Sequence, residues 1–338
     1  MSHLKTKKFY VCSCFFYKNI FLKDYALHVE YEGDDKFIAQ YESVFTQKYS
    51  VNLEKLKQEI IPFVRAEIDK RRDRGKLCLE RCMYIEQNYK PLHTQVYTLD
   101  PRFLEPAFIQ IVNYCKSAGS TKEGLLSLIK KEAPGRSYSF PVFTNEFCKL
   151  LVEELEYFEA SPMPKDRPNT MNNFGLLLSE VGFDLRFMDP WRIEYLVPIS
   201  RLLYPDCCGG SLDSHRVFIV RYKLGEDLDL ATHFDNAEVT INVSIGDVFE
   251  GGDLYFGRMS QDGTAGLPKD YKWYKHINGT GLVHRGLQFH GAAPITSGTR
   301  YNLIMWMRSS QLRNKLCPMC NSAPQLEESI GYGDGFML

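Results

Sequence analysis

The sequence predicts an α+β fold in which a double-stranded β-helix, or jelly roll, with supporting helices follows a mainly helical N-terminal region. Beyond residue 204, short segments of alternating polar and apolar residues are separated by Gly, Asp, Asn or Pro, a texture typical of antiparallel sandwiches and barrels. Before residue 204, apolar residues recur at the spacing of amphipathic helices. Helices that precede such strands are expected to support one of the two sheets.

The patterning divides the 338-residue chain into three regions. Residues 1–137 are expected to form a helical and mixed region to which no role is assigned. Residues 138–310 form the main domain, with its jelly-roll core at 213–308, and residues 311–338 form a tail that contains Cys-Pro-Met-Cys. The first boundary falls at residues 133–136, where Ala-Pro-Gly-Arg ends the helical periodicity.

The N-terminal region contains the patterns of two helices. The first 50 residues are rich in aromatics and favour a short strand pair or irregular packing. A helix is then predicted from Asn52 towards Arg74, where Pro62 should kink or split it. A second helix is expected over residues 121–131, with Leu125, Leu126 and Ile129 on one face.

The main domain begins with a short strand and a helix that Thr144 should cap. A proline- and asparagine-rich loop at 162–175 follows, and a second helix is expected over residues 190–203. Both this loop and the segment 257–275 are candidate determinants of substrate specificity. Five strands are predicted after residue 204: HRVFIVRYK, VTINVSI, GGDLYFG, GTGLVHRG and RYNLIMWMR.

Composition limits the classes of function. The chain is 44% hydrophobic and 25% charged, as in ordinary globular proteins. A formal charge of -1 argues against a nucleic-acid partner, and no apolar run approaches the roughly 20 residues of a membrane span. The segment FYVCSCFFY follows three lysines but lacks a small-residue cleavage site, so we interpret it as a strand rather than a signal peptide. Ten dispersed cysteines suit reduced thiols in the cytoplasm or nucleus.

A candidate metal site centres on the triplet His233-Phe234-Asp235. Residues two apart on an extended strand point to the same side, so His233 and Asp235 can reach one ion. Two imidazoles and one carboxylate are the ligands of mononuclear iron oxygenases. The third ligand is expected to be His290, with His284 as its competitor. Arg300 favours His290, because it starts a strand soon afterwards and can pair with the distal carboxylate of a co-substrate.

The strand patterns predict a pocket wall beside these ligands. In VTINVSI, the polar residues Thr240, Asn242 and Ser244 alternate with apolar ones, so one face packs on the core and the other lines a polar space. The same alternation in RYNLIMWM places four side chains on one face: Arg300, Asn302, Ile304 and Trp306. In HRVFIVRYK it places Phe218, Val220 and Tyr222 on one face. Tyr222 is a candidate hydroxyl donor to a bound carboxylate.

The segment VRYKLGEDLDLATHFDNAEVTINVSI, with GGDLYF, His290 and GTRYNLIMWM, resembles the catalytic domain of the 2-oxoglutarate and iron-dependent dioxygenases of the prolyl and lysyl hydroxylase class. The likeness is greatest to the lysyl hydroxylase branch. It implies that His233, Asp235 and His290 bind Fe(II) and that Arg300 binds the C5 carboxylate of 2-oxoglutarate. Tyr222 and Asn242 match positions near this co-substrate, and Thr240 is a further candidate.

The resemblance also implies the reaction: molecular oxygen and 2-oxoglutarate are consumed, succinate and carbon dioxide are released, and an unactivated C–H bond of a protein or amino-acid side chain is hydroxylated. L-Ascorbate is expected to keep the iron reduced. Two alternatives stay open: a non-catalytic metal-binding jelly roll used as an interaction module, and a cupin-like zinc or manganese enzyme. Neither requires the carboxylate partner Arg300.

A second group of metal-ligand residues lies at the two ends of the chain. Cys317 and Cys320 have the C-x-x-C spacing of half a zinc site. Cys12 and Cys14 can supply the other half if the termini meet. The alternative interpretation is a pair of reduced thiols in a turn.

Overall fold

The computed structural model describes five stretches of the chain, residues 8–25, 27–132, 136–246, 249–263 and 266–330. Backbone contacts divide the chain into two compact units. Unit 1 comprises residues 1–80 and 313–338, and unit 2 comprises residues 81–312.

This division differs from the predicted boundary near residue 137, which lies inside unit 2. The segment before that boundary packs into the same core as the segment after it: the ring of Phe108 stacks on that of Phe140, with centroids 5.7 Å apart. Local periodicity does not reveal such packing, because it reports which face of a helix is buried and not what covers it.

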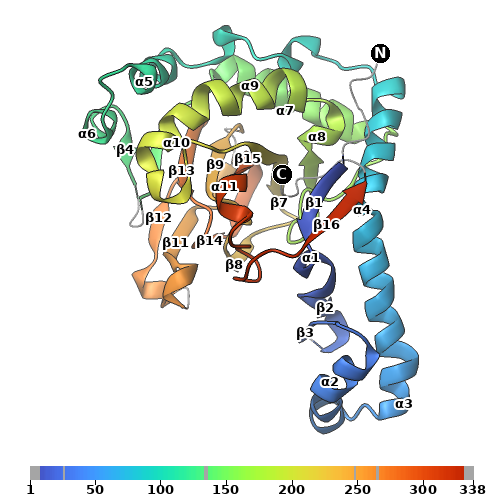
Figure 1. Ribbon diagram of the computed structural model, residues 1–338. Helices are drawn as coiled ribbons and strands as arrows, with labels where there is room; N and C mark the ends of the chain where they lie inside the picture. The colour runs from blue at the N-terminus through green and yellow to red at the C-terminus, as the bar shows by residue number, and fades with distance from the viewer. Residues whose placement is uncertain (1–7, 26, 133–135, 247–248, 264–265, 331–338) are drawn as a thin grey trace. The chain divides into compact units, whose positions relative to one another are not determined.

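Unit 1 joins the two ends of the chain in one antiparallel pair (Figure 1). Strand β1 (Lys8–Cys12) runs beside β16 (Leu326–Ile330), with Cys12 opposite Leu326. Unit 1 also contains the hairpin β2 (Ile20–Leu22) and β3 (Leu27–Val29) and the helices α1 (Cys14–Tyr17), α2 (Asp34–Tyr49) and α3 (Leu53–Lys55). Helix α4 (Ile61–Asn88) begins in unit 1 and ends in unit 2. Apolar residues of these elements form one core, which includes Phe16, Phe37, Phe45, Leu56 and Val64.

The helices of unit 1 correct two predictions. Helix α2 was missed, although Phe37, Tyr41 and Phe45 recur every four residues and Asp34 and Asp35 lie in its first turn.

The helix predicted from Asn52 begins as expected, since the Asn52 side chain accepts a hydrogen bond from the Lys55 N–H at 2.8 Å. Its predicted end near Arg74 is wrong, because Cys78, Cys82 and Ile85 continue the buried stripe. A π-helical turn at Leu56–Ile60 precedes Pro62, so the helix accommodates the proline without splitting.

Unit 2 is built on two antiparallel sheets. The larger has the order β4 (Lys130–Lys131), β5 (Tyr138–Pro141), β13 (Thr280–Arg285), β9 (Val239–Ser244), β15 (Ile295–Arg308), β7 (Ser214–Lys223) and β6 (Gly175–Leu177), with β10 (Phe249–Gly251) also on β15. The smaller has the order β12 (Lys272–Tyr274), β11 (Leu254–Met259), β14 (Gln288–Ala292) and β8 (Leu230–His233). All five predicted strands are present.

The helices of unit 2 are α5 (Pro106–Lys116), α6 (Lys122–Leu126), α7 (Asn145–Ala160), α8 (Leu178–Val181), α9 (Asp189–Trp191) and α10 (Val197–Leu203), with α11 (Ser310–Arg313) at its end. The predicted cap of α7 is confirmed, because the Thr144 hydroxyl accepts a hydrogen bond from the Phe147 N–H at 3.3 Å. The helix predicted over 121–131 ends at Leu126, since Lys130 and Lys131 pair with β5 instead.

The larger sheet has two different faces. One packs against α5, α7 and α10, with Ile241, Val243, Leu303 and Met305 among its buried residues, and Figure 1 shows α7 and α10 crossing this face. The other face and the smaller sheet contribute side chains to a common pocket. The α+β class is therefore confirmed. Within the described stretches, no helix combines the length and the apolar character that a bilayer span requires.

Candidate active site

His233, Asp235 and His290 meet at one point of this pocket. The Nε2 atoms of His233 and His290 each lie 3.6 Å from Oδ1 of Asp235, and the three ligand atoms lie within 4.8 Å of one another. A single ion about 2.1 Å from each atom can bridge the two distances of 3.6 Å. Two imidazoles and one carboxylate leave other positions of an ion open, which is the ligand pattern of mononuclear Fe(II) oxygenases.

The backbone brings the three ligands together in two ways. His233 ends β8 and lies directly opposite His290 of β14, so their side chains share one face of the smaller sheet. Asp235 lies in the loop after β8 and not on the strand, which corrects the prediction of a shared strand face. Its N–H donates to the carbonyl of Gly286 at 2.8 Å. A Cβ at Gly286 would lie 2.0 Å from the Ala237 carbonyl oxygen, so glycine permits this close approach.

Hydrogen bonds set both imidazoles in the tautomer that a metal requires. Nδ1 of His233 lies 2.8 Å from the carbonyl oxygen of Ala231, and Nδ1 of His290 lies 2.8 Å from that of Gln288. A carbonyl oxygen can only accept, so each Nδ1 carries the proton. The lone pair of each Nε2 therefore points towards the shared carboxylate oxygen.

The electrostatics of the site favour the metal-binding protonation states of His290 and Asp235, whereas the pKa of His233 is raised, because the carboxylate of Asp235 outweighs the lowering effect of burial. Burial lowers the pKa of His290 to about 3, against the opposing charge of Asp235. Burial by itself would raise the pKa of Asp235, but the neighbouring His290 and His233 lower it overall. At neutral pH, His290 is thus a neutral donor and Asp235 an ionised one.

Thr240 holds the other oxygen of this carboxylate. Its Oγ1 donates to Oδ2 of Asp235 at 2.7 Å, and Thr240 is fully buried on the pocket wall. A hydrogen bond to a ligand fixes its orientation. Thr240, predicted as a co-substrate contact, lies where it orients the carboxylate of the candidate ligand Asp235.

The predicted strand faces form the pocket wall. Strand β7 contributes Phe218, Val220 and Tyr222, β9 contributes Thr240 and Asn242, and β15 contributes Arg300, Ile304 and Trp306. Asn302, predicted on the same face of β15, donates to Oδ1 of the pocket residue Asn242 at 2.7 Å. Leu254 and Ala292 face them from the smaller sheet. The side chains beside the candidate ligands are thus mainly apolar, with a few polar groups directed inward.

Arg300 is a buried cation on this wall. It is 2% exposed, and its guanidinium carbon lies 4.0 Å from the centre of the Tyr222 ring. Nη1 donates to the carbonyl of Gly252, while Nε is buried with no hydrogen-bond partner among the described residues. Burial lowers the pKa of Arg300, but a guanidinium stays charged in proteins. A buried cation with an unused donor favours an anionic ligand.

The pocket also contains Asn172, which was not predicted as a part of the site, and His284, which was predicted only as the competitor of His290. Asn172, from the loop at 162–175, is buried and donates through Nδ2 to the Tyr222 hydroxyl at 3.0 Å. The asparagine cluster of that loop is the only sequence signal for this contact, and it does not name the partner. His284 lines the pocket with its ring centre 4.8 Å from that of His290. Within the described residues, however, the three-ligand group contains His290 and not His284.

Known proteins match this chain over nearly its full length. A family profile described as the OGFOD2-like domain matches residues 85–209. The 2-oxoglutarate and iron-dependent oxygenase domain-containing protein 2 of Danio rerio is 47% identical over 332 residues, which are 98% of this chain and 95% of that protein. The chain belongs to this family of 2-oxoglutarate and iron-dependent oxygenase domain-containing proteins. The resemblance seen in the sequence is confirmed at the level of the family.

More distant relatives match a part of the chain. The human procollagen-lysine,2-oxoglutarate 5-dioxygenase 1 is 30% identical over 182 residues, which are 50% of this chain and 23% of that protein. A crystal structure of prolyl 4-hydroxylases from Phytophthora capsici aligns with a TM-score of 0.42 and a sequence identity of 13%. The alignment covers 61% of this chain and 66% of the chain in that crystal structure. The oxygenase family is thus established by the near-full-length relatives.

Proposed function

We propose that this member of the oxygenase family is an active Fe(II)- and 2-oxoglutarate-dependent dioxygenase with a jelly-roll catalytic core. It hydroxylates an unactivated C–H bond of a protein or amino-acid side chain. In the balanced reaction, 2-oxoglutarate, O2 and the C–H substrate give succinate, carbon dioxide and the hydroxylated product. The observation that carries this proposal is the convergence of three ligand atoms within 4.8 Å beside a buried guanidinium.

His233, Asp235 and His290 would hold the iron. When bound, Fe(II) supplies the oxidative chemistry that no side chain of this chain can perform. The two imidazoles offer Nε2 lone pairs because Ala231 and Gln288 fix their tautomers. Thr240 keeps the carboxylate of Asp235 turned so that Oδ1 faces both rings.

Arg300 and its neighbours would bind 2-oxoglutarate. The guanidinium pairs with the C5 carboxylate, which satisfies the buried Nε. Tyr222, held by Asn172, presents its hydroxyl on the same wall, and Asn242 lies on β9, the strand that pairs with the strand of Arg300. Phe218, Leu254, Ile304 and Trp306 keep water away from the bound co-substrate.

The substrate and the reductant belong to the same proposal. The loop at 162–175 reaches the pocket through Asn169 and Asn172, which supports its role in substrate specificity. L-Ascorbate would reduce iron that becomes oxidised in turnovers without hydroxylation. None of the ten cysteines, all of them in the described stretches, forms a disulfide, which supports a cytoplasmic or nuclear location.

Succinate release tests the proposal without knowledge of the substrate. The full-length chain is incubated with Fe(II), ascorbate and 2-oxoglutarate, and succinate is measured for the wild type, for His233→Ala and for His28→Ala. His28 is exposed in unit 1, so its replacement controls for the loss of an imidazole. We expect the wild type and His28→Ala to release succinate and His233→Ala to release none. Equal succinate from His233→Ala would exclude the proposed iron site.

A further inference from the structure

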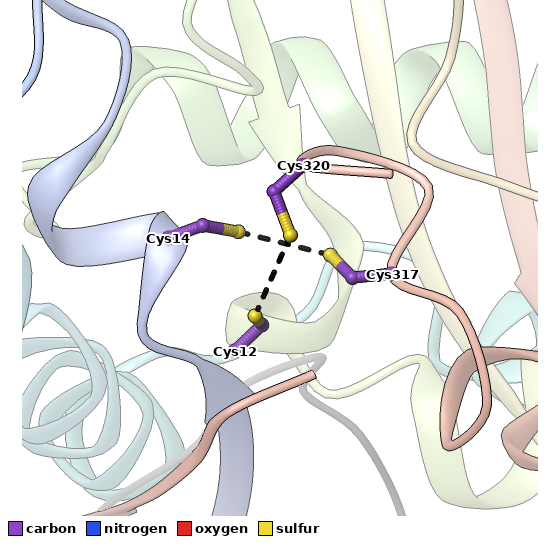
Figure 2. Close-up of side chains that lie close together, drawn as sticks. All are labelled: Cys12, Cys14, Cys317 and Cys320. Atoms are coloured by element: carbon purple, nitrogen blue, oxygen red, sulfur yellow. Dashed lines mark hydrogen bonds between the residues drawn. The ribbon is translucent and has the colours of Figure 1, made fainter. Parts of the chain in front are cut away.

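The two ends of the chain bring four cysteines together in unit 1. Figure 2 shows Cys12, Cys14, Cys317 and Cys320 with their sulfur atoms directed towards a common centre. Sγ of Cys12 lies 3.9 Å from Sγ of Cys320, Sγ of Cys14 lies 3.7 Å from Sγ of Cys317, and all four lie within 4.8 Å of one another. The two close pairs join residues 308 and 303 positions apart in the sequence.

These distances match one kind of cysteine chemistry. A disulfide requires about 2.05 Å between sulfurs, so neither close pair has the spacing of a bond. Four thiolates at about 2.3 Å from a single zinc ion form a tetrahedron whose edges are about 3.8 Å. An iron–sulfur cluster would spread its thiolates farther apart than a single ion does.

We propose that Cys12, Cys14, Cys317 and Cys320 bind one structural zinc ion that joins the N-terminal and C-terminal segments of unit 1. Binding converts four thiols to thiolates and releases their protons to water, without a redox step. Four sulfur ligands fill the coordination sphere of zinc, so this site has no open position for a substrate.

The backbone around the cluster is arranged to hold such a site. Cys12 ends β1, and the next residue, Ser13, donates its N–H to the carbonyl of Gln325 at 2.7 Å. In the C-terminal segment, the Cys317 N–H donates to the carbonyl of Ser322, and the Asn321 N–H donates to the carbonyl of Cys317, each at 2.8 Å. This forms a tight turn.

The fold of unit 1 gives the zinc ion a structural task. Within the described residues, its terminal strands β1 and β16 form a two-stranded sheet, and a two-stranded sheet is marginally stable without further support. Metal coordination contributes directly to the folding of small sites of this kind. The cluster lies at the end of that strand pair, where Cys12 is opposite Leu326.

Metal analysis of the purified full-length chain tests this proposal. We expect one zinc ion per chain in the wild type, and loss of zinc in Cys317→Ser/Cys320→Ser. The matched control is Cys207→Ser/Cys208→Ser in unit 2, since both pairs contain one buried and one half-buried cysteine. His233→Ala should also keep its zinc, so the zinc and iron sites fail independently. Zinc retained in the Cys317/Cys320 variant, or iron in place of zinc in the wild type, would overturn the proposal.

Two measurements on the wild type remain decisive even if that variant does not fold. Thiol alkylation followed by mass spectrometry should leave the four cysteines unmodified until a strong chelator is added. Replacement of zinc by Co(II) should give the intense visible absorption and near-ultraviolet charge-transfer bands of a tetrahedral thiolate site. Alkylation of all four cysteines without a chelator, or the disulfides Cys12–Cys320 and Cys14–Cys317 in the purified chain, would contradict the proposal.

Discussion

The two candidate metal centres differ in the properties that decide what a metal ion does. The centre in unit 2 offers two nitrogens and one oxygen and opens onto a pocket that contains Arg300. The centre in unit 1 offers four sulfurs, three of them from buried cysteines. An ion with three protein ligands keeps positions free for reactants, whereas an ion with four thiolates has none. One centre is therefore suited to catalysis and the other to holding the chain together.

The origin of the ligands differs in the same way. His233 and His290 lie opposite each other on neighbouring strands, and Asp235 lies in the loop just after His233, so the first centre is assembled from one strand pair and the loop that follows it. The cysteine centre joins segments from the two ends of the chain. Damage to the first should stop chemistry and leave the fold, while damage to the second should weaken unit 1.

Loss of an iron ligand should give the largest effect and separate the two centres most clearly. His290→Ala removes one of three ligands and should abolish Fe(II) binding and succinate release, with zinc content unchanged. Metal analysis and the succinate assay on one preparation measure both outcomes. His28→Ala is again the control. Loss of zinc together with iron would show that the centres do not act independently.

Removal of the buried guanidinium should affect the co-substrate and spare the iron. Hydrogen bonds to charged groups contribute about 1.5–3 kcal/mol, so Arg300→Ala should raise the KM for 2-oxoglutarate ~10- to 150-fold. Arg300→Lys should recover part of the loss because it restores the charge without the planar guanidinium.

The control for Arg300 is Arg186→Ala, which removes an exposed arginine of unit 2. Steady-state kinetics at saturating Fe(II), with iron content measured in parallel, separates the two binding events. An unchanged KM for 2-oxoglutarate in Arg300→Ala would contradict the assignment of Arg300 as the partner of the C5 carboxylate.

A smaller effect is expected from the hydrogen bond behind the carboxylate ligand. Thr240→Val keeps the shape of the side chain and removes the 2.7 Å bond to Asp235. Partners of metal ligands typically change metal affinity ~10- to 100-fold, and we expect the lower end because Oδ1, the oxygen that faces the histidines, is untouched. The Fe(II) concentration for half-maximal activity measures this effect. Thr296→Val, at an exposed position of β15, should leave that concentration unaltered.

The smallest effect should come from the cap of α7, which supports the larger sheet from outside the pocket. Thr144→Ala removes the acceptor for the Phe147 N–H and should lower the free energy of unfolding by about 1 kcal/mol. Thr144→Ser should restore it. Urea unfolding measures the change, and both metal contents should stay at the wild-type level. A loss of iron here would indicate that α7 positions the catalytic centre.

Features encoded by local patterns could be predicted from the sequence. The alternation in VTINVSI predicted a strand with one core face and one pocket face, and Ile241 and Thr240 lie on those two sides. The Thr144 cap followed from the preference of helix starts for hydroxyl side chains. The H-x-D triplet also brought two ligands together, although Asp235 sits in a loop and not on the strand.

Features that depend on contacts between distant segments could not be predicted in the same way. The pairing of β1 with β16 joins opposite ends of the chain, and no local pattern specifies a strand's partner. The bond from Asn172 to Tyr222 spans 50 residues. Phe108 packs on Phe140 across the predicted boundary near residue 137, and both residues lie in unit 2, which begins at Arg81. No local pattern indicates this contact. The cysteine cluster was predicted only on the condition that the termini meet.

Anaerobic binding of 2-oxoglutarate to the Fe(II)-loaded chain tests the central claim most directly, because it requires neither the unknown substrate nor turnover. A 2-oxoglutarate molecule that chelates Fe(II) produces a visible metal-to-ligand charge-transfer band. We predict that the wild type develops this band to saturation with one 2-oxoglutarate per chain, and that His233→Ala does not develop it. A wild-type chain that shows no band, or a His233→Ala chain that shows the same band, would contradict the assignment of His233, Asp235 and His290 as the iron site.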